Sequence, residues 1–211
     1  MQYTMFTLIR EIRGKNPHEL AELLFDRLSS DKETFKSNER FYLHGMNGRL
    51  IHLLLARLTE YVEIKSGRQS RYKEYIQRGG KNGYEIEHIW ANHFEEHSDE
   101  FSHPADFKDY RNRIGGLLLL PKSFNASYGD LPYEQKKKYY AIKQNLLAQS
   151  LCKETYEHDP GFNKFVSESK LPFKSYETFK KSDLDERQNL YINLAEQIWN
   201  PENIKKILIS N

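Results

Sequence analysis

Two short strand-like segments, set in a chain whose other apolar residues follow helical spacing, constrain the fold most. Residues Tyr84 to Ile89 alternate aromatic or aliphatic side chains with acidic ones, which is typical of a half-buried strand. Residues Ile114 to Pro121 form an apolar run bounded by glycine and proline, which is typical of a short buried strand. We expect the polar residues between them, 92 to 110, to form a loop. The sequence therefore predicts two strands joined by a long polar segment.

Apolar residues at intervals of three and four predict helices in the rest of the chain. The sequence Asn-Pro-His-Glu at residues 16 to 19 offers an N-cap, a first-turn proline and a capping glutamate, so a helix should begin there. Further helices are expected from about Glu39 to Val62 and from about Pro132 to Leu151. The last helix should open at Ser182 or Asp183. The expected fold class is mainly α with an embedded strand-strand-helix (ββα) hairpin.

The single cysteine and the modest net charge limit the classes of site and partner. Cys152 is the only cysteine among 211 residues, which excludes an internal disulfide and a cysteine-rich zinc site. Any metal must therefore be held by His, Asp, Glu or Asn. A net charge of +2 leaves the partner open. Apolar runs stay far below the ~18 residues of a membrane span and the first residues lack signal-peptide features, so we expect a soluble, cytoplasmic protein with no membrane partner.

A carboxylate and a histidine stand next to each other at the end of the first predicted strand. Glu87 and His88 could divide the work of phosphodiester hydrolysis, with the carboxylate facing a metal ion and the imidazole facing the attacking water. Asn125 follows the second strand and could return to the same place as a neutral oxygen ligand. Such oxygens suit Mg²⁺ or Mn²⁺. A Glu-His pair alone is more often structural, so the order and spacing of the other residues carry this inference.

Four blocks of sequence carry a family resemblance: Glu87-His88-Ile89, the run from Arg111 to Leu120, Asn125, and the segment from Tyr133 to Lys136. Together they resemble the HNH domain at the C-terminus of GmrSD-type modification-dependent restriction enzymes. That family has an acidic residue before His-Ile, then Ile-Gly-Asn-Leu-x-Leu-Leu, an Asn, and aromatic-x-x-Lys. The chain also resembles phage-defence proteins such as SspE, which carry an HNH domain. The resemblance is good from about residue 84 to residue 140 and weaker in the flanking helices.

The resemblance implies a role for each matching residue. His88 matches the general base, Glu87 and Asn125 match two ligands of a single divalent ion, and Lys136 matches a lysine that contacts the phosphate or the leaving group. An endonuclease that nicks or cleaves DNA and leaves a 5′-phosphate is implied. A DNA-backbone surface needs basic residues, although a solvated helix face explains the lysines near residue 137 equally well. The basic residues that cluster near the site in sequence are Arg111, Arg113, Lys122, Lys137 and Lys138.

Two positions depart from the family pattern. Ala91 stands where the family has Pro, and Gly116 stands where it has the Asn that braces the loop carrying the base. We expect Asn112 or Asn92 to substitute for that missing Asn. The departures leave a second interpretation open, in which the chain is a catalytically inactive helical DNA-binding module.

A third interpretation is a zinc site built from clustered histidines. His93, His97 and His103 could join His88 as ligands. No Glu stands in the His-Glu-x-x-His position, so a polar surface segment with exposed histidines explains this stretch without metal.

The expected organisation has three parts. Residues 1–80 form a helical subdomain, residues 81–151 form the ββα-metal HNH core, and residues 152–211 form a helical extension that packs on the core. In the proteins that the chain resembles, a nucleotide-hydrolysing sensor domain precedes the HNH domain. We therefore expect an effector domain of an anti-phage or modification-dependent restriction protein, with the N-terminal sensor domain missing from this chain.

Overall fold

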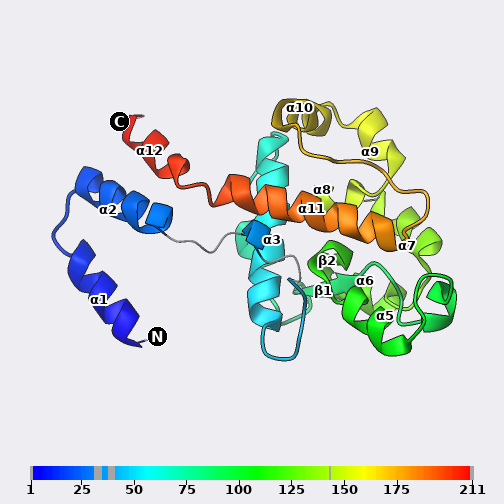
Figure 1. The fold of residues 1–211 in the computed structure, drawn as a ribbon. Coiled ribbons are helices and arrows are strands. Elements are labelled where there is room, and N and C mark those ends of the chain that lie inside the picture. The colour runs from blue at the N-terminus through cyan, green and yellow to red at the C-terminus, as the bar shows by residue number, and fades with distance from the viewer. Residues whose placement is uncertain (1, 31–34, 38–40, 143, 210–211) are drawn as a thin grey trace. The chain divides into compact units, whose positions relative to one another are not determined.

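The computed structural model describes residues 2–30, 35–37, 41–142 and 144–209 (Figure 1). Helices dominate these residues, and the sheet they contain is a single antiparallel pair of strands. The mainly helical fold class is therefore confirmed. Within the same described ranges, no helix combines the length and the apolar character needed to cross a membrane.

Contacts between Cα atoms divide the chain into two compact units, residues 1–38 with 196–211 and residues 39–195. The expected boundaries near residues 80 and 151 both fall inside the larger unit, and the three-part organisation stays a prediction. The helices of the smaller unit are α1 (Gln2–Ile12), α2 (Pro17–Ser30), the 3₁₀ turn η1 (Phe35–Ser37) and α12 (Glu202–Ile209).

The start of α2 shows the predicted capping box. The backbone N–H of Glu19 donates to Asn16 Oδ1 at 3.0 Å, and the backbone N–H of Asn16 donates to Glu19 Oε2 at 2.9 Å. These two bonds satisfy donors that the first helical turn would otherwise leave without partners. Helix α2 then packs against α12, where the Lys205 ammonium lies 3.6 Å from the centre of the Phe25 ring. The sequence-based start of this helix is confirmed.

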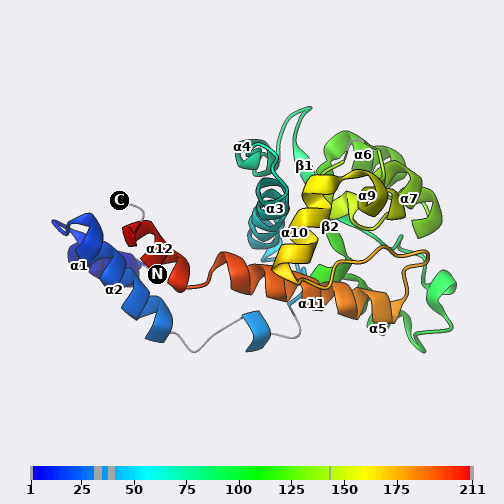
Figure 2. The same cartoon turned by 90° about the horizontal axis from the view of Figure 1, so that it is seen from above.

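The larger unit surrounds the hairpin with helices (Figure 2). Helix α3 packs against the second strand, and α11 runs across α3 in Figure 1. The helix expected to open at Ser182 or Asp183 is α11, which begins at Lys181, and the Asp183 carboxylate accepts a bond from the Lys180 N–H at 2.9 Å in its first turn. The helices are α3 (Gly48–Lys65), α4 (Tyr72–Tyr75), α5 (Pro104–Arg111), α6 (Lys122–Tyr128), α7 (Tyr133–Tyr140), α8 (Leu146–Gln149), α9 (Lys153–His158), α10 (Pro160–Ser169) and α11 (Lys181–Ile198).

The hairpin consists of β1 (Tyr84–His88) and β2 (Leu117–Pro121) in antiparallel register. Tyr84 lies opposite Pro121, and His88 lies opposite Leu117. Strand β2 is three residues shorter than the strand predicted from the sequence, because Ile114–Gly116 form a 3₁₀ turn, η3, before it. Helix α6 follows β2 directly and contacts both strands.

Three sequence-based expectations about helices were wrong. Residues 92–110 are not a loop, because they contain the 3₁₀ turn η2 (Phe94–His97) and α5, which His103 caps by accepting from the Ala105 N–H at 3.1 Å. The helix expected from residue 39 begins at Gly48. Residues 39 and 40 lie outside the described residues. Asn47 Nδ2 donates to the Tyr42 carbonyl at 2.9 Å in a turn that precedes the helix.

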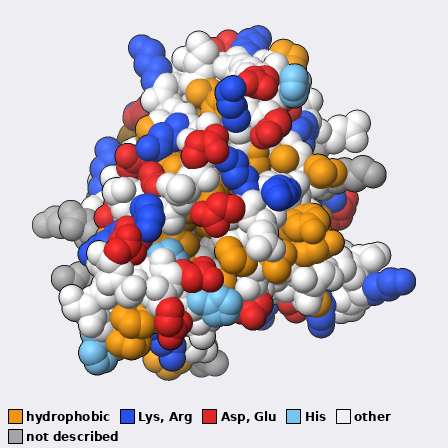
Figure 3. Space-filling view, turned by 90° about the vertical axis from the view of Figure 1, so that its right-hand side faces the viewer, with side chains coloured by type: hydrophobic (Ala, Val, Ile, Leu, Met, Phe, Trp, Pro, Cys, Tyr) orange, Lys and Arg blue, Asp and Glu red, His pale blue; other side chains and the backbone are white. Residues whose placement is uncertain are grey.

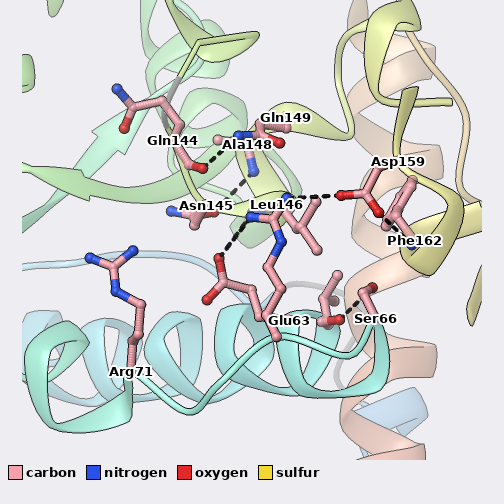
Figure 4. Close-up of polar contacts among 12 residues, drawn as sticks. Glu63, Ser66, Arg71, Gln144, Asn145, Leu146, Ala148, Gln149, Asp159 and Phe162 are labelled. Atoms are coloured by element: carbon pink, nitrogen blue, oxygen red, sulfur yellow. Dashed lines mark hydrogen bonds and ion pairs between the residues drawn. The ribbon is translucent and has the colours of Figure 1, made fainter. Parts of the chain in front are cut away.

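The helix expected over residues 132–151 is interrupted after Tyr140 by the cap of α8. Asn145 Oδ1 accepts from the Ala148 N–H at 3.0 Å (Figure 4). Its Nδ2 donates to the Leu119 carbonyl of β2 at 2.7 Å. Figure 4 also shows the buried Glu63 carboxylate of α3, which accepts a 3.4 Å bond from the Leu146 N–H. The break in the helix thus ties α8 to both α3 and the hairpin.

Helix α11 approaches the turn before β2 closely, and this explains both glycines there. A Cβ on Gly115 would stand 2.9 Å from Gln188 Cα, and a Cβ on Gly116 would stand 2.9 Å from Leu184 Cδ1. The Gly115 N–H donates to the Gln188 side chain at 3.1 Å. A larger side chain at residue 116, where the resembling family has Asn, would therefore require the Leu184 side chain of α11 to move.

Candidate active site

Glu87, at the end of β1, forms a buried ion pair with Lys136 of α7. The Lys136 Nζ donates to Glu87 Oε1 at 2.6 Å and to the His88 carbonyl at 2.8 Å. The Glu87 side chain is 2% exposed and the Lys136 side chain 0%. One ammonium thereby fixes both the carboxylate of residue 87 and the backbone of residue 88.

Burial and pairing act on this ion pair in opposite directions. Burial raises the pKa of Glu87 and lowers the pKa of Lys136, because removal from water disfavours each charged form. The attraction between the two groups opposes both shifts, and the nearby Arg111 guanidinium further favours the ionised Glu87. A buried pair with this geometry is costly to break from either side.

His88 is held as a neutral imidazole with one nitrogen available. Its Nε2 lies 2.9 Å from Asn112 Oδ1, and because an amide oxygen only accepts, Nε2 carries the proton and Nδ1 is an acceptor that receives no hydrogen bond from the part of the chain that the structure describes. Burial first, and then the charges of Arg111 and Lys136, lower the pKa of His88 to about 4. Asn112 therefore occupies the bracing position that we expected of Asn112 or Asn92, while Asn92 is exposed.

The low pKa of His88 predicts how the stability of the metal-free protein depends on pH. The folded-state pKa of about 4 lies below the ordinary 6.5, so between these values the unfolded chain binds more protons than the folded one. The free energy of unfolding should therefore rise as the pH increases from 4 to 6.5. Urea unfolding in EDTA measures this slope, which His88→Ala should reduce and which His18→Ala, an exposed imidazole, should leave unchanged.

The amide of Asn125, on α6, lies close to the carboxylate of Glu87. A Cβ built on Gly129 would stand 2.9 Å from Asn125 Oδ1 and 3.6 Å from Glu87 Oε2, so the two oxygens cannot be farther apart than the sum of these distances. The other end of the amide donates from Nδ2 to Glu85 Oε2 at 3.3 Å. Both oxygens thus lie beside Gly129, on the side where a Cβ would stand, and oxygens of this kind suit a hard divalent ion that takes its remaining ligands from water and phosphate.

The basic residues that the sequence assigned to DNA binding have different surroundings. Arg111 lies at the site, where its Nε donates to the Trp90 carbonyl at 2.9 Å and its charge acts on Glu87 and His88. Arg113 instead pairs with Asp185 at 3.1 Å, and Lys137 pairs with Glu177 at 3.0 Å. Lys122 and Lys138 are exposed. Their part in DNA binding stays a prediction, and the face in Figure 3 mixes basic and acidic side chains.

The histidines of the zinc interpretation have separate partners. His93 lies between Glu96 at 3.3 Å and Asp130 at 3.2 Å, while His97 pairs with Glu100 at 3.3 Å. Among the residues that the structure describes, no group of three or more His, Cys, Asp or Glu side chains could hold a metal ion.

Two acidic residues near the site were missed by the sequence reasoning. Glu85 shares the face of β1 with Glu87, since residues two apart in a strand point the same way. Asp130 follows α6, and its charge acts on Arg111 and Lys136. The alternation in β1 could have indicated Glu85, whereas Asp130 has no local signal because its position depends on the turn between α6 and α7.

Comparison with known protein families identifies the family of the chain. A family model described as the C-terminal domain of GmrSD restriction endonucleases matches residues 26–206. Searches of curated proteins and of solved structures return no match. The family match spans most of the 211 residues, including all four blocks of the resemblance and every candidate site residue. The chain therefore belongs to the family of C-terminal domains of GmrSD restriction endonucleases.

Proposed function

We propose that this chain is a metal-dependent nuclease of the HNH type, which nicks DNA and uses His88 as its general base. The observation that carries the proposal is the orientation of His88, whose Nε2 faces Asn112 and so leaves Nδ1 as the acceptor, on the residue next to a carboxylate that lies beside Gly129 together with Asn125 Oδ1. The order β1, β2, α6 supports an HNH-type ββα arrangement, with Glu87 and His88 on β1 and Asn125 on α6. Family membership supports a nuclease with DNA as its substrate.

The protein's own groups have distinct roles in this mechanism. His88 Nδ1 accepts the proton of the attacking water, and the bond from Nε2 to Asn112 holds the ring in the tautomer that leaves Nδ1 available. Glu87 and Asn125 would hold Mg²⁺ or Mn²⁺, which when bound supplies positive charge to the phosphate and to the leaving oxygen. Lys136 keeps Glu87 ionised and fixes the backbone of His88.

Arg111 suits contact with the scissile phosphate. Its guanidinium is half-buried and anchored by one nitrogen, so its remaining donors are held in place with little entropy left to lose. Lys136, in contrast, is fully enclosed and already donates to two protein oxygens. We assign the phosphate contact to Arg111 and regard Lys136 as acting on the substrate through Glu87 and His88.

The biological setting follows from the family. We propose that the chain is a restriction-type effector that acts on phage or modified DNA in the cytoplasm. A nucleotide-hydrolysing sensor domain would control it. One catalytic centre per chain predicts nicks with 5′-phosphate ends, and a double-strand break would need two chains or two visits.

Supercoiled plasmid tests the proposal directly. Incubation with Mg²⁺ or Mn²⁺ should convert it to relaxed circles, and EDTA should stop the reaction. Ligation of the nicked product by a DNA ligase would report the 5′-phosphate. Plasmid that is bound but stays supercoiled with either metal would instead support the inactive DNA-binding module.

The brace on His88 predicts a selective effect on turnover. Asn112→Ala removes the acceptor that fixes the tautomer, so kcat should fall by about 10- to 100-fold, while KM for DNA should change little. Asn92→Ala is the matched control, because Asn92 is exposed, and its kcat should equal that of the wild type. Equal kcat in both variants would show that Asn112 does not brace the base.

A further inference from the structure

The amide of Asn125 lies near two carboxylates, with Glu85 at its donor end and Glu87 on the side of its acceptor end. Nδ2 donates to Glu85 Oε2 at 3.3 Å, and Oδ1 is the end that lies near Glu87 Oε2. The two ends of an amide have nearly the same shape but opposite hydrogen-bonding character. In the reversed orientation the NH₂ group would donate to Glu87 and occupy the place of a cation.

Glu85 is itself fixed in the position from which it holds the amide. It lies on the same face of β1 as Glu87, and its Oε1 lies 3.7 Å from the Lys122 ammonium at the start of α6. Lys122 and Asn125 belong to the same helix, so Glu85 ties β1 to α6 through both carboxylate oxygens. Its side chain is 37% exposed, and it therefore contributes little to the core.

We propose that Glu85 is a positioning residue that turns the Asn125 amide oxygen toward Glu87 and so prepares the metal site. This inference rests on the proposed function, because it assumes that Glu87 and Asn125 are the ligands. Glu85 does not touch the ion itself in this role. It determines whether the oxygen or the NH₂ group of the Asn125 amide faces the ion.

Mn²⁺ binding to the full chain, followed by electron paramagnetic resonance, tests the role without depending on activity. Glu85→Ala should weaken Mn²⁺ binding by about 10-fold, the lower end of the effect of losing a partner that orients a ligand. Glu85→Gln keeps an oxygen that can accept from Nδ2 and should retain most of the affinity. Glu134→Ala, an exposed acid on α7, is the matched control and should bind Mn²⁺ like the wild type.

A double-mutant cycle separates orientation from simple charge attraction. In an Asn125→Asp background the ligand has two equivalent oxygens, so orientation no longer matters and adding Glu85→Ala should cause no further loss of affinity. An equal loss in both backgrounds, or equal losses for Glu85→Ala and Glu85→Gln, would overturn the proposal in favour of a charge effect. Thermal unfolding of each variant verifies that the fold persists.

The outcomes also distinguish this inference from the proposed function. A wild-type chain that binds Mn²⁺ and nicks plasmid, together with a Glu85→Ala variant of unchanged affinity, would overturn the role of Glu85 alone. A wild-type chain that neither binds Mn²⁺ nor nicks plasmid would overturn both.

Discussion

His88→Ala should lower the rate of plasmid nicking by about 10²- to 10⁴-fold, the range by which a positioned general base accelerates a reaction. The imidazole is the group at the site with a free acceptor nitrogen and a pKa low enough to keep it neutral at pH 7. Single-turnover nicking with saturating Mg²⁺ or Mn²⁺ measures the loss. Filter binding of the same plasmid should show that the affinity for DNA is retained, because the ring is neutral and makes no ion pair.

A histidine outside the site provides the comparison for this variant. His158 is exposed at the end of α9, and His158→Ala should nick at the wild-type rate. Nicking that survives His88→Ala within a few-fold would remove His88 as the base. The conclusion would be firm if thermal unfolding showed both variants folded.

Lys136→Met should destabilise the protein by about 3–5 kcal/mol, because it leaves the Glu87 carboxylate buried without its partner. Nicking should be lost in the same variant, since the backbone of His88 also loses the bond from Nζ. Urea unfolding measures the first effect and plasmid relaxation the second. Lys153→Met, at an exposed ion pair with Glu157 on α9, is the control and should leave the free energy of unfolding almost unchanged.

The double variant Glu87→Leu with Lys136→Met separates stability from chemistry. Replacing both members of a buried ion pair by apolar side chains is often neutral or stabilising, so the double variant should recover most of the lost stability. It should remain unable to nick DNA, because the carboxylate ligand is gone. Recovery of both properties would show that this ion pair has no part in the reaction.

Local signals predicted those elements whose partners lie nearby in the chain. The capping box at Asn16 and Glu19 and the first turn of α11 could be predicted because their hydrogen bonds join residues three apart in the chain. The two strands could be predicted because each has a local pattern of apolar residues. The family was also recognisable from the order of four short blocks, which the match to residues 26–206 confirms.

The errors arose where a tertiary contact overrides local spacing. Residues 141–145 contain no glycine or proline to mark the end of a helix, but Asn145 binds the Leu119 carbonyl and caps a separate helix, α8. Helix α5 was missed because histidine is an uncommon N-cap, although Pro104 at the first helical position was a usable signal. At the site, the sequence indicated Glu87, His88 and Asn125, whereas the partners that orient them depend on the packing of separate elements.

The close approach of α11 to the turn before β2 has a consequence for the order of events during synthesis. Every proposed site residue is made before Gln188 and Tyr191, yet Gly115 needs the Gln188 side chain, and the Leu117 carbonyl, opposite His88, accepts from the Tyr191 hydroxyl at 2.9 Å. A nascent chain that has not yet reached these residues has an unsupported hairpin. We therefore expect the hairpin to gain these two hydrogen bonds only after α11 has been synthesised.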